Sequence, residues 1–219
     1  MKIRFKFFVL ILLLFFNVGL YSIEFQTSYL NEIEKKYGID ARRRLQGWQS
    51  LIQENQKSDE KAKLEKVNIF FNLMNYYTDI SHWGKEDYWA TPLEFIVSGG
   101  GDCEDYTIAK YFTLLEMGVP DDKLLITYVK ELILNQAHMV LAYYPTPEAI
   151  PLILDNFNKE LLPADQRPDL KPIYGFNGKG LWEAKEFALG HKIAQPDDRQ
   201  RWVDLKERMK AGAIGKFYN

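Results

Sequence analysis

The sequence contains a single cysteine, and the residues before it are rich in glycine. Cys103 follows Gly99-Gly100-Gly101 and Asp102, and the helical spacing of the apolar residues after it predicts that it lies in the first turn of a helix. The positive end of a helix dipole favours anions, so this position stabilises a thiolate. The glycines permit positive φ and let the backbone approach a bound substrate closely. The segment predicts a nucleophilic thiol, with a buried and inert cysteine as the alternative.

A nucleophilic thiol needs a base, and His138 is the candidate. It lies in a segment that predicts a strand and shares one face with Val140 and Ala142, so we expect it to point into the protein. A buried imidazole needs a partner at its other nitrogen. Asp155 ends an apolar run 17 residues later and can meet the histidine from the neighbouring strand. Together with Cys103 this predicts a Cys-His-Asp arrangement, with a hydrogen-bonded core histidine as the alternative for His138.

Three acidic residues flank the cysteine, and their charge opposes the helix dipole. Asp102, Glu104 and Asp105 would raise the pKa of the thiol by repulsion. One explanation is helix capping, with Asp102 as N-cap and Asp105 three residues later. The other is a bound cation, because hard carboxylate oxygens beside flexible glycines suit Ca²⁺. The sequence has no EF-hand loop and no Cys/His set for zinc, and spacing alone leaves both explanations open.

The N-terminus has the pattern of a secretory signal. Three basic residues precede an unbroken apolar run from Phe7 to Phe16, and small residues such as Ser22 follow. We expect residues 1–22 to be a signal peptide and residues 23–219 to form one domain, with an uncleaved membrane anchor as the alternative. Removal of the signal would change the formal net charge from −2 to −5. This balance argues against binding to nucleic acid or to anionic membranes.

The rest of the chain predicts helices first and strands later. Residues 24–80 carry apolar residues at helical spacing, with a polar break at which Ser58 is suited to cap the next helix. Further helices are expected at Thr91–Val97 and from Asp102 to Met117. Strands are predicted at Leu124–Leu134, Gln136–Tyr144, Leu152–Asp155 and Ile173–Phe176, and a last amphipathic helix at Asp197–Lys210. This order predicts an α+β fold with an N-terminal helical lobe packed on an antiparallel β-sheet.

Four segments together resemble the bacterial transglutaminase-like cysteine proteinases. They are Trp89–Glu94, Gly101–Tyr106, Ala137–Leu141 and Leu154–Asn156, within a resemblance that runs from about Tyr88 to Trp182. The resemblance implies a papain/transglutaminase-like fold. It also implies that Cys103, His138 and Asp155 form the catalytic triad. Calcium dependence is implied too, with Asp102 and Glu104 as metal ligands.

The resemblance further implies a periplasmic cysteine endopeptidase that depends on calcium. The implied substrate is a large surface adhesin, cut in its N-terminal region so that the adhesin is released and the biofilm disperses. The implied second partner is an inner-membrane receptor for cyclic-di-GMP, whose periplasmic domain binds the protease and holds it away from the adhesin. Three alternatives remain at this point: a transglutaminase, a peptidoglycan amidase with the same triad, and a binding module with an inactive site.

Overall fold

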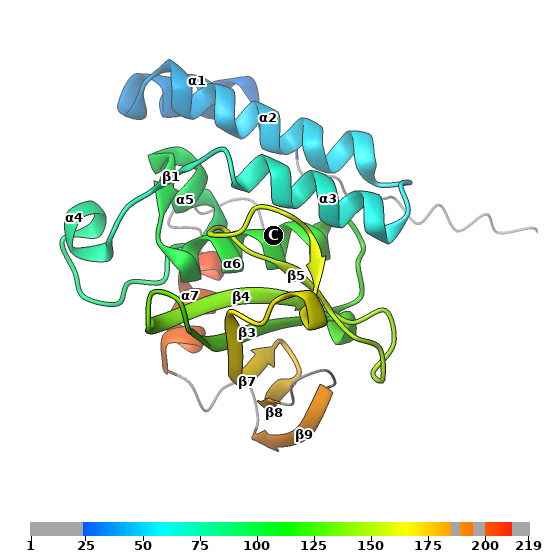
Figure 1. Ribbon diagram of the computed structural model, residues 1–219. Helices are drawn as coiled ribbons and strands as arrows, with labels where there is room; N and C mark the ends of the chain where they lie inside the picture. The colour runs from blue at the N-terminus through cyan, green and yellow to red at the C-terminus, as the bar shows by residue number, and fades with distance from the viewer. Residues whose placement is uncertain (1–23, 185–188, 195–199, 212–219) are drawn as a thin grey trace, which may run out of the picture.

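The computed structural model describes residues 24–184, 189–194 and 200–211. The predicted signal peptide, residues 1–22, lies outside these ranges and stays a prediction, as does the start of the predicted last helix. Within the described ranges, no helix is both long enough and apolar enough to cross a membrane. The described chain forms a layer of helices against a β-sheet (Figure 1).

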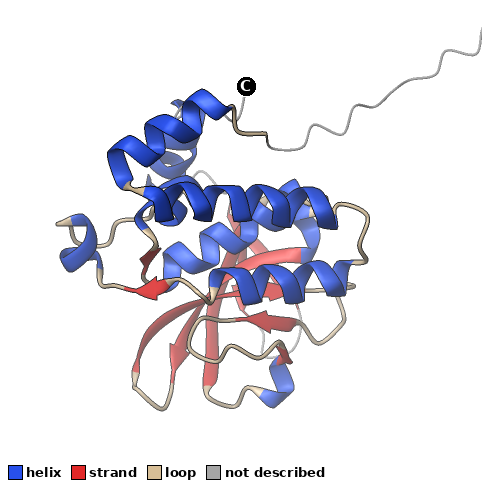
Figure 2. Ribbon diagram, turned by 90° about the horizontal axis from the view of Figure 1, so that it is seen from above, coloured by secondary structure: helices blue, strands red, loops and turns tan. Residues whose placement is uncertain are grey.

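The helical layer comes mainly from the N-terminal half of the chain. Its helices are α1 (Thr27–Tyr37), α2 (Ile39–Asn55), α3 (Glu60–Phe71), α4 (Asp79–Trp83), α5 (Pro92–Ser98), α6 (Cys103–Glu116) and α7 (Gln200–Ala211), with 3-10 turns η1 (Asp121–Lys123) and η2 (Ala164–Gln166). Helix α6 contacts α3 and α5 on one side and the sheet on the other (Figure 1). The view from above shows the helices lying across the strands (Figure 2). Helix α7 joins this layer through Trp202, which stacks on Phe112 of α6.

The main sheet is antiparallel and has seven strands in the order β6-β5-β4-β3-β7-β8-β9 within the described residues. The strands are β3 (Leu124–Glu131), β4 (Gln136–Tyr143), β5 (Leu152–Leu154), β6 (Leu162–Pro163), β7 (Leu170–Asn177), β8 (Gly180–Ala184) and β9 (Leu189–Ala194). A separate parallel pair joins β1 (Asn75–Tyr76) to β2 (Gly100–Gly101). The predicted α+β class, with a helical lobe on an antiparallel sheet, is confirmed. Strands β6, β8 and β9 were not predicted, and β6, with two residues, is too short to carry a periodicity of its own.

Side-chain alternation along β4 divides the interior into two cores. Met139, Leu141 and Tyr143 join the main core between the sheet and α6, where Ile108 and Leu114 are fully buried. The intervening residues of β4 join a smaller core, made of Leu125, Val129, Val140, Ala142, Tyr144 and Ile153. Helix α6 is thereby held against the central strands β3 and β4. The fold fixes the end of α6 that carries the cysteine beside the strand that carries the histidine.

Helix α5, at Pro92–Ser98, begins and ends one residue later than the predicted Thr91–Val97. Thr91 Oγ1 accepts a hydrogen bond from the Glu94 N–H at 3.2 Å, and the Glu94 carboxylate accepts one from the Thr91 N–H at 2.7 Å. Pro92 occupies the first turn, where its missing N–H costs nothing. Gly99 ends the helix at φ +88°, which only glycine adopts without strain. The chain is thus turned sharply into the glycines that precede Cys103.

Two helix caps differ from the prediction. Asp59, not Ser58, caps α3, and its carboxylate accepts a hydrogen bond from the Ala62 N–H at 2.8 Å. Asp102 stands at the N-cap position of α6, but its side chain makes no capping hydrogen bond. Asp105 does not reach back to complete a capping box either, because it binds other groups. The capping explanation for the acidic residues beside the cysteine is therefore wrong.

Candidate active site

The glycines before Cys103 allow the protein's own segments to approach one another. Gly100 pairs with Asn75 in the parallel pair, and a Cβ on Gly100 would overlap the carbonyl of Asn75. A Cβ on Gly101 would overlap the carboxylate of Asp105. These glycines were predicted to admit a substrate, and the structure instead gives them an internal packing role. They place the start of α6 against the β1 segment.

Cys103 is the first residue of α6, and its half-buried side chain lines a cleft of about 780 Å³. The walls include Trp89, Tyr128, His138 and Tyr174. Tyr128 and Tyr174 stack on each other across β3 and β7, with ring centroids 5.1 Å apart. The thiol is therefore reachable from a groove with aromatic walls, rather than sealed in an apolar core.

Thr107 ties the helix that carries the cysteine to the strand that carries the histidine. Its hydroxyl oxygen lies 2.8 Å from the carbonyl oxygen of Cys103 and 3.0 Å from that of Met139, the residue after His138. The hydroxyl is buried, so water does not compete for these two acceptors. Cys103 and His138 are in this way held at the same cleft.

His138 and Asp155 form a buried pair. The Nε2 atom of His138 lies 2.7 Å from Oδ1 of Asp155, and both side chains are fully buried. The pairing of β4 with β5 brings Leu141 opposite Leu154, which carries the residue after β5 towards the start of β4. Phe157 stacks on the imidazole with ring centroids 4.1 Å apart and covers one of its faces. The structure thus brings together the histidine and the aspartate that the sequence paired.

The charge of Asp155 decides which nitrogen of His138 carries the proton. Burial alone would raise the pKa of this carboxyl, but hydrogen bonds from His138, the Phe157 N–H and Arg167 outweigh it and hold the pKa well below its usual value. An ionised carboxylate only accepts hydrogen bonds, so His138 must donate from Nε2. Its Nδ1 atom then keeps a lone pair, and it has no hydrogen-bond partner among the described residues. That nitrogen is free to take a proton in the cleft.

The thiol of Cys103 is held in its neutral form by its surroundings. Burial raises its pKa well above the ordinary value, and the charges of Glu104 and Asp102 raise it further. The Sγ atom lies 2.9 Å from a carboxylate oxygen of Glu104, to which the thiol donates. A hydrogen bond from the Met139 backbone acts in the opposite direction. The predicted helix-dipole stabilisation of a thiolate is outweighed here by burial and by the two carboxylates.

Three carboxylates beside the thiol form a cluster with the chemistry of a calcium site. Asp79, Asp102 and Glu104 each offer one oxygen, and these oxygens lie within 4.8 Å of one another. The Oδ1 atoms of Asp79 and Asp102 are buried and have no hydrogen-bond partner among the described residues. Burial and the charges of Glu104 and Asp105 raise the pKa of Asp102 to about 10. Buried, unpartnered carboxylate oxygens that repel one another fit a bound divalent cation.

Asp105 stands next to this cluster but has a structural task. Its carboxylate accepts hydrogen bonds from the Ala90 N–H at 2.7 Å and from the Trp83 indole at 3.2 Å. It thereby fixes the segment before α5 to the first turn of α6. Trp89 of the cleft wall stacks on Phe176 and donates its indole N–H to Asp87.

Sequence reasoning placed most of the site but missed several residues. It found Cys103 and His138, which share the cleft. It also found Asp102 and Glu104, which belong to the acidic cluster. It missed Asp79, which comes from α4, 23 residues before Asp102, with no motif at that spacing. The missed contacts of Asp155 are Asn72 after α3, Lys110 in α6 and Arg167 after η2, which meet only in the folded chain.

Residues 43–168 match the family described as bacterial transglutaminase-like cysteine proteinase. The structure is similar to calcium-bound LapG from Legionella pneumophila, with 49% sequence identity, a TM-score of 0.73, and coverage of 84% of this chain and 99% of that chain. An EGTA-treated form of Legionella LapG matches with 48% identity, a TM-score of 0.72, and coverage of 85% and 99%. A comparison with curated protein sequences finds no match.

Proposed function

The chain belongs to the bacterial transglutaminase-like cysteine proteinases and is a cysteine peptidase, and from this premise we propose that it is a periplasmic, calcium-dependent endopeptidase that cuts a large surface adhesin. The cut falls in the N-terminal region of the adhesin, which releases it from the cell and promotes biofilm dispersal. The observation that carries the proposal is the cleft shared by Cys103 and His138, with His138 hydrogen-bonded to Asp155. This is the arrangement that thiol acyl transfer requires.

The proposed reaction follows from the roles of these three side chains. His138 Nδ1 takes the proton of Cys103, and the thiolate attacks the carbonyl carbon of the scissile peptide bond. The leaving amine receives the proton from the imidazolium, and a thioester remains on Cys103. Water, activated by the same nitrogen, then hydrolyses the thioester and frees the new carboxyl end. Asp155 holds the imidazole in the required tautomer and stabilises its charged form.

The backbone N–H of Cys103 is suited to stabilise the oxyanion of this reaction. The N–H groups in the first turn of a helix have no intrahelical acceptor, and the helix dipole adds positive potential there. Because the helix starts at the nucleophile itself, the donor lies next to the attacked carbonyl.

Calcium is the proposed cofactor, with Asp79, Asp102 and Glu104 as ligands. The support is the carboxylate cluster, in which the Oδ1 atoms of Asp79 and Asp102 have no partner among the described residues, together with the calcium-bound form of the similar Legionella LapG. A bound divalent cation would supply positive charge that offsets the carboxylates beside the thiol. Asp79 extends the ligand pair expected from the sequence to three residues.

The location and the second partner are part of the same proposal. The basic and apolar N-terminal pattern supports export to the periplasm, where the N-terminal region of a membrane-retained adhesin would be accessible. An inner-membrane receptor for cyclic-di-GMP is the proposed regulator, which binds the protease and keeps it from the adhesin. Similarity to LapG supports both statements.

The proposal is tested by incubating the purified protein with the recombinant N-terminal region of a large repeat-containing adhesin. We expect two fragments in calcium, none in excess EGTA, and none with the Cys103→Ala variant in calcium. If the adhesin fragment stays intact under all conditions, the proposed substrate is wrong. If the Cys103→Ala variant cuts it, Cys103 is not the nucleophile.

The rival activities leave different products. Hydrolysis in ¹⁸O-labelled water places the label in a new carboxyl end, whereas a transglutaminase would join glutamine side chains to an added amine. A peptidoglycan amidase would digest muropeptides. The family match favours peptide hydrolysis, and labelled carboxyl ends are the expected result.

A further inference from the structure

Arg167 lies behind Asp155, on the side away from the histidine. Its Nη2 atom donates to Oδ2 of Asp155 at 2.7 Å, while Oδ1 accepts from His138 and from the Phe157 N–H. The arginine side chain is 2% exposed and the aspartate side chain 0%. Both oxygens of the carboxylate are therefore held from opposite sides, and the plane of the carboxylate cannot rotate without breaking a buried hydrogen bond.

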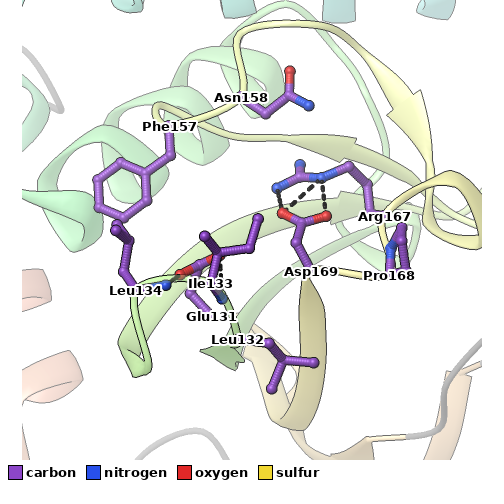
Figure 3. A pocket seen from close by; sticks show the side chains of 9 residues that line it. All are labelled: Glu131, Leu132, Ile133, Leu134, Phe157, Asn158, Arg167, Pro168 and Asp169. Atoms are coloured by element: carbon purple, nitrogen blue, oxygen red, sulfur yellow. Dashed lines mark hydrogen bonds and ion pairs between the residues drawn. The ribbon is translucent and has the colours of Figure 1, made fainter.

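The arginine is itself fixed by its neighbours. Asp169 accepts hydrogen bonds from the Nε and Nη2 atoms of Arg167, which clamps the guanidinium (Figure 3). The main chain of Arg167 donates to Ala164 O and accepts from the Leu170 N–H, each at 3.1 Å. Pro168 follows and disfavours a helical backbone at Arg167, which stands at φ −121° and ψ 62°. The guanidinium is a rigid support rather than a mobile surface charge.

The backbone of Asp155 is held as firmly as its side chain. Its carbonyl oxygen accepts from Asn72 Nδ2 at 2.8 Å and from Lys110 Nζ at 3.0 Å, and both donors are buried. With the main chain fixed in this way, the remaining freedom of Asp155 is rotation of its carboxylate. Arg167 is the side chain that contacts the oxygen that His138 does not use.

We infer that Arg167, held by Asp169, is a positioning residue that orients the Asp155 carboxylate towards His138 and so sets the imidazole for acyl transfer. This inference rests on the proposed function of Cys103, His138 and Asp155. Arginine suits the task because its planar guanidinium bonds two carboxylates at once through fixed donors, which lysine does not reproduce. The paired Asp169 offsets the charge of Arg167, so that the arginine orients Asp155 without cancelling its effect on the imidazole.

The test compares Arg167→Met and Arg167→Lys with Arg42→Met, in which a different arginine loses an ion pair. Arg42 joins α2 to Glu34 of α1 at 2.6 Å, in elements that do not line the cleft. With the adhesin fragment as substrate, we expect Arg167→Met to lower kcat roughly 10- to 100-fold with little change in KM, because misplaced catalytic groups cost about this much. Arg167→Lys should recover part of the loss, and Arg42→Met should match the wild type.

A second readout needs no substrate. In protein labelled with ¹⁵N-histidine, the proton on His138 Nε2 should resonate downfield because it is shared with a carboxylate, and the His138→Gln variant identifies the signal. Arg167→Met should shift or broaden this resonance, and Arg42→Met should not. If Arg167→Met does not fold, as judged by circular dichroism, Arg167→Lys and Asp169→Asn carry the same test with smaller expected losses of kcat.

The outcomes separate the inference from the function on which it rests. A folded Arg167 variant with wild-type kcat and an unshifted His138 resonance would overturn the inference, as would a rise in KM alone. Undiminished cleavage by Cys103→Ala or Asp155→Ala would instead overturn the proposed function. If Cys103→Ala and Asp155→Ala are inactive while Arg167→Met is fully active, the proposed triad is supported and only the positioning role of Arg167 is wrong.

Discussion

The Nε2 atom of His138 lies 2.7 Å from Oδ1 of Asp155, with both side chains removed from solvent. This hydrogen bond leaves Nδ1 as the nitrogen that serves the cleft. His138 therefore holds a defined tautomer, because Asp155 stays ionised although it is buried.

Asp155→Asn tests the tautomer. An asparagine can fill the same space, but its amide group can present a donor to Nε2 and reverse the tautomer that the reaction needs. We expect kcat to fall by about 10⁴, the loss that follows when the acid of such a triad is replaced by its amide. Steady-state cleavage of the adhesin fragment measures this. A variant with kcat within about threefold of the wild type would show that the hydrogen bond has no part in catalysis.

The acidic cluster predicts that calcium stabilises the protein more as pH rises. The raised pKa of Asp102, about 10, means that the folded protein without cation holds a proton that the unfolded chain releases above about pH 4. Because the pKa of Asp102 is higher in the folded than in the unfolded protein, its contribution to the free energy of unfolding is present below about pH 4 and is lost as pH rises towards about 10. A bound cation removes this loss by neutralising the carboxylates.

Thermal unfolding with calcium or with EGTA checks this prediction. The increase in Tm caused by calcium should be larger at about pH 8.5 than at about pH 5.5, by about 4 °C or more. Asp102→Asn is the control, and it should abolish the response to calcium while raising the Tm of the calcium-free protein at the higher pH. An equal calcium effect at both pH values would argue that these carboxylates do not hold the ion.

Replacing a glycine by alanine should change the stability of the protein in opposite directions at Gly100 and at Gly47. Gly100→Ala places a methyl group against the Asn75 carbonyl and should lower the free energy of unfolding by about 2–3 kcal/mol. Gly47→Ala lies inside α2, where the nearest atom to the new methyl group is Phe70 Cε2 at 3.4 Å. There alanine should raise stability by about 0.5–1 kcal/mol. Urea unfolding at equal m-values measures both, and a neutral Gly100→Ala would contradict the close pairing of β1 with β2.

The helices, strands and site residues that depend on local sequence patterns are predicted from the sequence. Apolar spacing predicts α6, alternating residues predict β3, and Pro92 predicts the first turn of α5. The lone Cys103 at a helix start predicts the position of the cleft. His138 and Asp155 were paired because each lies in or directly after an apolar segment that predicts a strand. These features are local, so a single sequence is enough to find them.

Other parts of the site depend on contacts between distant segments, which periodicity does not record. Asp79 joins the acidic cluster because β1 pairs with β2, which brings the start of α4 towards α6. Arg167 meets Asp155 through the turn before β7. The pKa of the thiol also differs from the prediction, because the sequence does not show that burial and Glu104 outweigh the helix dipole.

The central claim is that His138 activates the thiol of Cys103, and the rate of alkylation by iodoacetamide tests it directly. Cys103 is the only cysteine in the chain, so the modification has one site and needs no knowledge of the substrate. At neutral pH and in calcium, the account predicts fast labelling of the wild-type protein and labelling at least about tenfold slower in a folded His138→Ala variant. Equal rates in the two proteins would contradict it.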